Sequence, residues 1–263
     1  MRPEADALPA VPLESRHGAC WLWRDGESDG LSREALSKEA LSKEALSKDH
    51  LDEQFLLQHF LQVFSPDGVS AGSPIATGGR GSAWRVEIDG RSYVCRQYRR
   101  GGLIARFNQD LYLWSGAHQT RPYQEWVVMH QAANAGLHVP RPLAAIACKT
   151  TGLFYRAAIL TPWVEHEGSL ASVEREQAWF NAGQSIARMH AALIWHADLN
   201  VHNILIDQQD RAWLIDFDRA RSHVSDPKVL RSNLTRLLRS VNKVCPDLGQ
   251  RLWPVLCDGY ASG

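Results

Sequence analysis

The feature that most constrains the fold of this chain is a pair of short apolar runs near its C-terminal end. Residues 204–206 and 212–215 each predict a short buried strand, and the polar residues 207–210 predict the turn between them. Polar residues precede the first run, in His196-Ala-Asp198-Leu-Asn200-Val-His202-Asn203, and follow the second, in Asp216-Phe-Asp218. The sequence therefore predicts that Asn203 and Asp216 lie at neighbouring strand ends and face one cleft.

This order of polar residues is typical of phosphoryl transfer. In such a site one Asp orients and deprotonates the attacking hydroxyl, an Asn five residues later reaches a metal, and a second Asp holds Mg²⁺ against nucleotide phosphates. Asp198 is the candidate base, and Asn203 and Asp216 are the candidate metal ligands. A single His-x-Asp is commonly a turn with a solvated Asp, but the ordered set between two strands is much rarer. We therefore expect a kinase-like site that uses ATP and Mg²⁺.

Length, charge and cysteine content set the class of protein. The 263 residues can bury a sizeable core, and Lys+Arg equals Asp+Glu at 29 each, which gives no general attraction to nucleic acid or membrane. No signal pattern and no apolar run near the ~20 residues of a membrane span is seen, so we expect a protein on the cytoplasmic side. The five cysteines are scattered without a CxxC pair, which favours reduced thiols in a cytosol.

The N-terminal third contains a repeat of five residues. In residues 31–49 each Glu stands four residues before a Lys, which is favourable on a helix. The leucines recur every five residues and build no apolar stripe. We interpret the repeat as a solvated helical insertion without chemistry. Residues 49–64 have a usable apolar face, where the helix rejoins the fold.

Residues 75–86 predict a glycine loop between two strands. Glycines let the backbone approach phosphates, so Gly79, Arg80 and Gly81 are candidates for nucleotide binding. Most such glycine pairs are plain turns, but residues 86–96 predict a β-hairpin just behind this one. The third glycine of the protein-kinase pattern is absent, and Trp84 stands in its place.

A phosphate-binding Lys is expected on the strand after that hairpin, where the chain has Arg96. Arg can clamp phosphate oxygens with its forked N–H groups, although Arg99 lies nearby and leaves the assignment open. Glu125 is the candidate partner, on a helix with Pro122 near its start and Gly136 after its end. The alternative for Glu125 is an ordinary solvated helix residue.

Three further segments complete the expected fold. Residues 143–147 and 156–160 predict strands, and residues 161–164 predict a hinge whose backbone could bind an adenine edge. A helix from 174 to 190 leads into the catalytic loop. Only a short stretch follows Asp216, which leaves no room for the elements that hold a peptide substrate. A small-molecule or glycolipid acceptor is therefore expected.

Basic residues gather in two places despite the neutral total. One is the run 91–109, with Arg91, Arg96, Arg99, Arg100 and Arg106. The other is a predicted helix over 227–244, with leucines on one arc and Lys228, Arg231, Arg239 and Lys243 on the other. These side chains are either merely solvated, or they contact anionic lipid headgroups or a polyanionic substrate.

Several of these segments resemble the 3-deoxy-D-manno-octulosonic acid (Kdo) kinase family. The resemblance covers residues 65–260 and rests on Arg99-Arg-Gly-Gly-Leu103, Asn108-Gln-Asp-Leu-Tyr112, 196–205, Trp213–Arg219 and Lys228–Ser240. It implies ATP-dependent phosphorylation of the 4-hydroxyl of a Kdo residue on lipid A, by a peripheral protein at the cytoplasmic face of the bacterial inner membrane. No nucleic-acid partner is implied.

The resemblance also implies roles for single residues. Asp198 is the base, Asn203 and Asp216 bind the metal, and Arg96 with Glu125 orients the phosphates. The candidates for acceptor binding are Arg99, Arg100, Asn200 and His202. Asn200 and His202 either shape the loop or touch the sugar, and a structural role for the imidazole of His202 is equally open.

The expected fold is α+β and protein-kinase-like. Residues 1–64 form an extension, 65–164 a small N-lobe with an antiparallel sheet, one key helix and the hinge, and 165–263 a short, mainly helical C-lobe. Two other functions remain open. One is an aminoglycoside- or choline-type phosphotransferase, which the basic C-terminal region disfavours because its acceptors are cations. The other is a nucleotide-binding pseudokinase, which the change to Arg96 alone favours.

Overall fold

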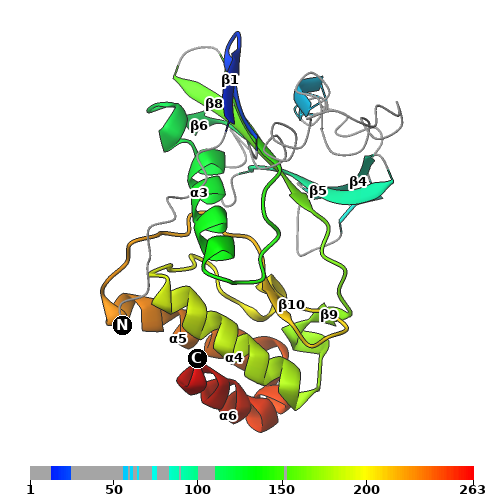
Figure 1. Cartoon of the computed structure of the whole chain (residues 1–263), viewed down its shortest axis with the longest axis vertical. Coiled ribbons are helices and arrows are strands. Elements are labelled where there is room, and N and C mark those ends of the chain that lie inside the picture. The colour runs from blue at the N-terminus through cyan, green and yellow to red at the C-terminus, as the bar shows by residue number, and fades with distance from the viewer. Residues whose placement is uncertain are drawn as a thin grey trace, which may run out of the picture. The chain divides into compact units, whose positions relative to one another are not determined.

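The computed structural model describes residues 13–24, 56–58, 60–61, 64, 73–75, 83–88, 90–99, 110–150 and 153–263. The chain packs as two units, residues 1–123 with 142–163 (the sheet unit) and residues 124–141 with 164–263 (the helical unit). An antiparallel sheet dominates the first and helices dominate the second (Figure 1), so the expected α+β class is confirmed. The repeat 31–49 and the candidates Gly79, Arg80, Gly81 and Arg100 lie outside the described residues.

The sheet unit is built from one antiparallel sheet. Its strands are β1 (Leu13–His17), β2 (Cys20–Arg24), β3 (Ser73–Pro74), β4 (Ala83–Ile88), β5 (Arg91–Gln97), β6 (Tyr112–Leu113), β7 (Ala144–Lys149) and β8 (Phe154–Pro162). The order is β1-β2-β7-β8-β5-β4-β3, and β6 pairs with β8. A short 3₁₀ helix, η3 (Ala117–Gln119), follows β6.

The predicted β4–β5 hairpin is present and positions Arg96. Gly90 in its turn has φ 73°, a conformation that glycine adopts without steric cost. Alternate residues of β4, beginning with Trp84, are buried in one cluster with Leu56 and Phe60, which are each 2% exposed. On β5 the same alternation buries Cys95 and leaves Arg96 partly exposed. Part of the apolar face predicted for 49–64 is thus in the core.

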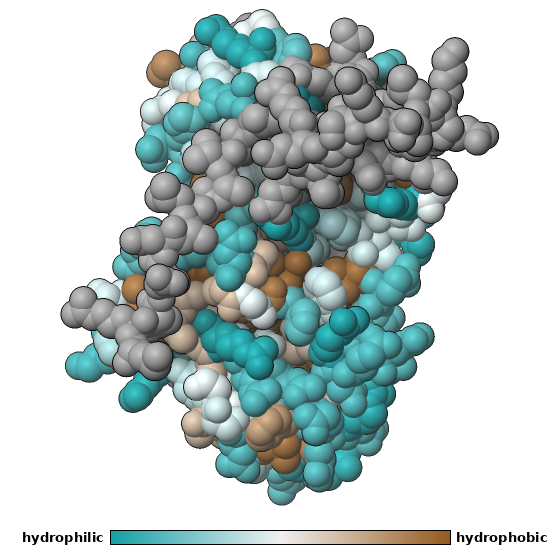
Figure 2. Space-filling model, viewed as in Figure 1, coloured by the Kyte–Doolittle hydropathy of each residue, from teal (hydrophilic) through white to brown (hydrophobic). Residues whose placement is uncertain are grey.

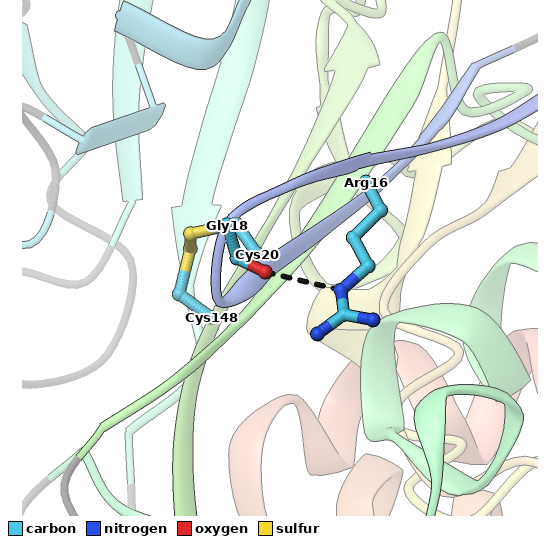
Figure 3. Close-up of a disulfide and its surroundings, with 4 residues drawn as sticks. All are labelled: Arg16, Gly18, Cys20 and Cys148. Carbon is cyan, nitrogen blue, oxygen red and sulfur yellow. Dashed lines mark hydrogen bonds between the residues drawn. A yellow bond between two sulfur atoms is a disulfide. The ribbon is translucent and has the colours of Figure 1, made fainter.

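The sequence did not predict β1 and β2, which form a hairpin that extends the sheet beside β7. Arg16 donates to the carbonyl of Gly18 within the turn (3.1 Å), and the register places Cys20 opposite Cys148. The two sulfurs form a disulfide (Figure 3). The expectation of five reduced thiols is therefore wrong for this pair. The two cysteines are 128 residues apart in the sequence, and only the pairing of β2 with β7 makes them neighbours.

The other three cysteines, Cys95, Cys245 and Cys257, are free. Burial raises the pKa of the Cys95 thiol to about 12, which makes it inert in the folded protein.

The disulfide predicts a thiol count. Protein unfolded without reductant is expected to show three reactive thiols, and five after reduction, measured with a thiol reagent and by mass. The Cys148→Ser variant is the control, since all of its remaining cysteines should react with or without reductant. Five thiols in the unreduced wild type would disprove the bond.

The helical unit carries the remaining elements. They are most of α3 (Arg121–Asn134), β9 (Gly168–Ser169), η4 (Leu170–Ser172), α4 (Glu176–Ala191), η5 (Val201–Asn203), β10 (Ile204–Ile206), β11 (Ala212–Leu214), α5 (Pro227–Val244) and α6 (Pro246–Ser262). As predicted, α3 has Pro122 in its first turn, and Gly136 after its end has φ 78°. The visible surface over α4 and α6 is mostly hydrophilic (Figure 2).

Helices α4 and α6 approach each other closely because glycines face the partner backbone. A Cβ added to Gly183 would meet the backbone of Leu256, and one added to Gly259 would meet that of Phe180. The predicted catalytic loop follows the C-terminal end of α4 at Ala191.

The predicted hinge lies where the chain passes from one unit to the other. Strand β8 ends at Pro162, the sheet unit ends at Trp163 and the helical unit resumes at Val164. Trp163 donates its backbone N–H to the carbonyl of Ser92 on β5 (3.0 Å). The division into domains at 64 and 164, and adenine binding by the hinge, remain predictions.

Candidate active site

A hairpin between β10 and β11 positions the candidate metal ligands. Asp207, 3% exposed, organises its turn: one carboxylate oxygen accepts from the backbone N–H groups of Gln209 and Arg211, and the other from the side chains of Arg211 and Trp213. Burial raises the pKa of Asp207, but these hydrogen bonds outweigh it and lower the pKa overall. The local sequence thus fixes the predicted turn.

The hairpin brings Asn203 and Asp216 together, as predicted. The N–H of Ile215 donates to the carbonyl of Asn203 (3.1 Å), so Asp216 follows directly beside the end of η5. Asp216 has φ 61°, an uncommon conformation for a residue with a side chain, and such conformations are concentrated at functional sites.

The candidate catalytic loop, residues 196–203, is held by His196, which is fully buried. The N–H of Asp198 donates to its Nδ1 (3.1 Å), so the ring proton lies on Nε2, which donates to the carbonyl of Ile215 (3.0 Å). One neutral imidazole therefore joins the loop of the candidate base to that of the candidate metal ligand. Burial lowers the pKa of His196, against the raising effects of the bond to Ile215 and of the carboxylates of Asp216 and Asp198.

Asp198 presents its carboxylate to solvent, with 56% of the side chain exposed. Its backbone carbonyl accepts from the amide nitrogens of Asn203 (2.9 Å) and Asn200 (3.0 Å). Because Nδ2 of Asn203 is used in this bond, its Oδ1 is the atom that can bind a cation. Carboxylate and amide oxygens are donors that suit Mg²⁺, which keeps several waters or phosphate oxygens as further ligands. Asn203 and Asp216 therefore fit the expected metal.

Asn200 shapes the loop. Its Oδ1 accepts from the N–H of His202 (2.9 Å) and caps η5, and its Nδ2 also contacts a carboxylate oxygen of Asp198 (3.3 Å). His202 lies exposed at the surface, which disfavours the buried structural role left open above.

Sequence reasoning missed the contribution of α5 to the site. Helix α5 has the predicted bounds, and its side chain Asn233 is fully buried. Asn233 accepts from the N–H of His196 (3.1 Å) and donates to the carbonyl of the same residue (2.6 Å). An Asn on the apolar arc of a helix is the signal that could have identified this contact, since a buried amide requires partners.

Two candidates for nucleotide binding, Arg96 and Glu125, belong to different units. Arg96 lies on β5, with its guanidinium 4.8 Å from the ring centre of Tyr98, and Glu125 lies on α3 and is 3% exposed. The burial of Glu125 disfavours a solvated role. Arg99 donates to the side chain of Gln97 (3.0 Å). The pairing of Arg96 with Glu125 remains a prediction, as does the binding of phosphates by Arg96 or Arg99.

Residues 71–260 match the model of the lipopolysaccharide kinase (Kdo/WaaP) family. The chain belongs to this family. It is 48% identical over 175 residues to the 3-deoxy-D-manno-octulosonic acid kinase of Xylella fastidiosa strain M23. The matched segment covers 65% of this chain and 70% of that protein. The protein of that name from Vibrio parahaemolyticus serotype O3:K6 is 45% identical over 171 residues, or 63% of this chain and 71% of that one.

A solved structure shows the same fold. It is described as WaaP in complex with acyl carrier protein, with a TM-score of 0.52 and 18% identity over 73% of this chain and 80% of that one. The lipopolysaccharide kinase family comprises phosphotransferases, so the predicted kinase activity and its use of ATP are confirmed. Within the described residues, no helix combines the length and apolar character needed to cross a membrane.

Three histidines of this chain, two buried and one partly buried, predict that its stability depends on pH. Burial lowers the pKa of His196, and also of His190 and His138, in the folded protein. In the unfolded chain the pKa of each is about 6.5. At a pH between the lowered pKa and about 6.5, the unfolded chain therefore binds more protons than the folded chain. The stabilisation is complete above about pH 6.5 and is lost as the pH falls through that range. Urea unfolding followed by tryptophan fluorescence from about pH 7.5 to about pH 5.5 measures it.

The variant His196→Asn should lose part of this slope. His223→Asn, which changes an exposed histidine at φ 58°, is the matched control and should keep it. An unchanged slope in His196→Asn would show that His196 does not contribute.

Proposed function

We propose that this chain phosphorylates the 4-hydroxyl of a Kdo residue on Kdo-lipid A, with ATP as the donor. The observation that carries the proposal is the sequence identity with curated 3-deoxy-D-manno-octulosonic acid kinases, 48% for the Xylella fastidiosa protein. The hydrogen-bonded set of Asp198, Asn203 and Ile215–Asp216 provides the chemistry that such a reaction needs.

The chain's own residues would act mainly by position and charge. The exposed carboxylate of Asp198 accepts the proton of the sugar hydroxyl as it attacks the γ-phosphorus, and the hydrogen bonds from Asn203 and to His196 hold its backbone still. Asn203 and Asp216 would hold Mg²⁺, which when bound neutralises charge on the phosphates. Arg96 and Glu125, with the loop of Gly79, Arg80 and Gly81, are proposed for nucleotide phosphates on sequence grounds alone.

The substrate test compares three acceptors. Purified protein with ATP and Mg²⁺ is given Kdo-lipid A, an aminoglycoside or choline, and the products are analysed by mass. We expect one added phosphate on the Kdo-containing glycolipid alone. Phosphate on a cationic acceptor would favour the aminoglycoside- or choline-type alternative, and ATP binding without transfer would favour a pseudokinase.

The base is tested by Asp198→Asn, which keeps the size of the side chain and removes the proton acceptor. We expect kcat to fall at least about 100-fold, the lower range for a general base, while ATP binding stays within about threefold. Asp258→Ala removes an exposed carboxylate on α6 and is the control. Full activity of Asp198→Asn would refute the assignment.

We further propose that α5 meets the membrane surface. Its basic residues Lys228, Arg231, Arg239 and Lys243 are all exposed, whereas Leu230, Leu237 and Val241 are buried beneath them. Anionic headgroups attract such a face by about 1 kcal/mol per basic residue near the surface. This supports a peripheral position at the cytoplasmic face of the inner membrane, where the glycolipid acceptor is found.

Vesicle binding tests this surface. The double variant Arg231→Gln/Arg239→Gln should bind phosphatidylglycerol vesicles about 30-fold more weakly than the wild type in sedimentation assays. Arg188→Gln/Arg251→Gln removes two exposed charges from α4 and α6 and should bind as the wild type does. Equal weakening by both double variants would indicate a nonspecific charge effect.

A further inference from the structure

One face of α5 holds the catalytic loop at two points. Asn233 bonds both backbone groups of His196, and the hydroxyl of Ser240 accepts from the N–H of Val201 (3.2 Å). The spacing of Asn233, Arg236 and Ser240 places the three side chains on the same side of the helix. Arg236 is therefore held between the two anchors, opposite Asp198.

The guanidinium of Arg236 makes one contact with the candidate base. Its Nη1 lies 3.4 Å from Oδ1 of Asp198, and the two side chains are 47% and 56% exposed. A strong Arg–carboxylate pair is shorter and uses two parallel N–H groups, and an exposed pair of this kind contributes little to stability. The loop is already fixed at His196 and Val201. Stability therefore does not explain why an Arg stands here.

An anionic acceptor would explain why a cation such as Arg236 stands beside Asp198. The carboxylate of Asp198 would lie near the reacting hydroxyl, and it would repel an acceptor of the same charge. Arg236 is a permanent cation, and its other N–H groups make no hydrogen bond within the described part of the chain. They can bind a second carboxylate while Nη1 stays at Asp198.

Kdo has this chemistry. Its carboxylate and its 4-hydroxyl are attached to ring carbons in a 1,3 relationship, so a guanidinium beside Asp198 that binds the carboxylate would keep the hydroxyl near Asp198. We propose that Arg236 forms a subsite for the acceptor carboxylate and thereby delivers the 4-hydroxyl to Asp198. This inference rests on the proposed function. In this inference Arg236 is the residue that makes the protein prefer an acidic sugar to a neutral or cationic one.

The test combines a change in the enzyme with a change in the substrate. Wild type, Arg236→Gln and Arg236→Lys are assayed with Kdo-lipid A and with the same glycolipid carrying a carboxamide in place of the Kdo carboxylate. Arg251→Gln is the control, since it removes an exposed guanidinium on α6 that contacts only the carboxylate of Glu174 (3.0 Å) among the described residues. Melting temperatures of all variants verify that the fold is kept.

We expect Arg236→Gln to raise the KM for Kdo-lipid A roughly 10- to 100-fold, the effect of losing a charge-assisted hydrogen bond, with the KM for ATP unchanged. Arg236→Lys should recover part of the loss because it keeps the charge but not the fork. With the carboxamide, wild type and Arg236→Gln should be equally poor, because the partner of the guanidinium is already missing.

Two results would overturn this inference and leave the proposed function intact. One is wild-type turnover of the carboxamide as efficient as that of the native acceptor. The other is an equal loss for both acceptors in Arg236→Gln, which would assign Arg236 to the orientation of Asp198. Absence of wild-type turnover of Kdo-lipid A would instead overturn the proposed function, and this inference with it.

Discussion

The arrangement of the active site depends on one buried pair, Asn233 and His196. The amide of Asn233 satisfies both backbone groups of His196, and the imidazole in turn bonds the backbone of Asp198 and of Ile215. A buried amide or imidazole without partners is costly, so each of these groups stabilises the position of the others. The loop of the candidate base, the loop of the candidate metal ligand and the helix α5 are thereby fixed relative to one another.

The contacts of Asn233 and His196 allow the side chain of Asp198 to be exposed while its backbone is held in place. A catalytic base, as proposed for Asp198, must be exposed to meet a substrate, and exposed side chains are poorly held by packing. The protein solves this by fixing its backbone instead, through contacts that lie in the buried layer beneath it. The histidine of the His-x-Asp pattern thus serves the geometry of the site, and its neutral state follows from its burial.

Local patterns predicted the parts of the structure that depend on neighbouring residues. The strands at 204–206 and 212–214 and the β4–β5 hairpin are marked by apolar residues beside a turn, and the helix over 227–244 is marked by its apolar period and its N-cap. The Cys20–Cys148 bond was missed because it requires β2 to pair with β7, and the two cysteines are 128 residues apart in the sequence. The role of Asn233 was missed for the same reason, since its partners lie 37 residues earlier in the chain.

Helix α5 faces the catalytic loop with one side and exposes a basic side next to it. If that basic side rests on a bilayer, the distance between the membrane surface and Asp198 is set by the rigid body of the helix and does not vary from one encounter to the next. The enzyme would then select a hydroxyl by its height above the lipid, and chemically similar hydroxyls further along a sugar chain would be out of reach.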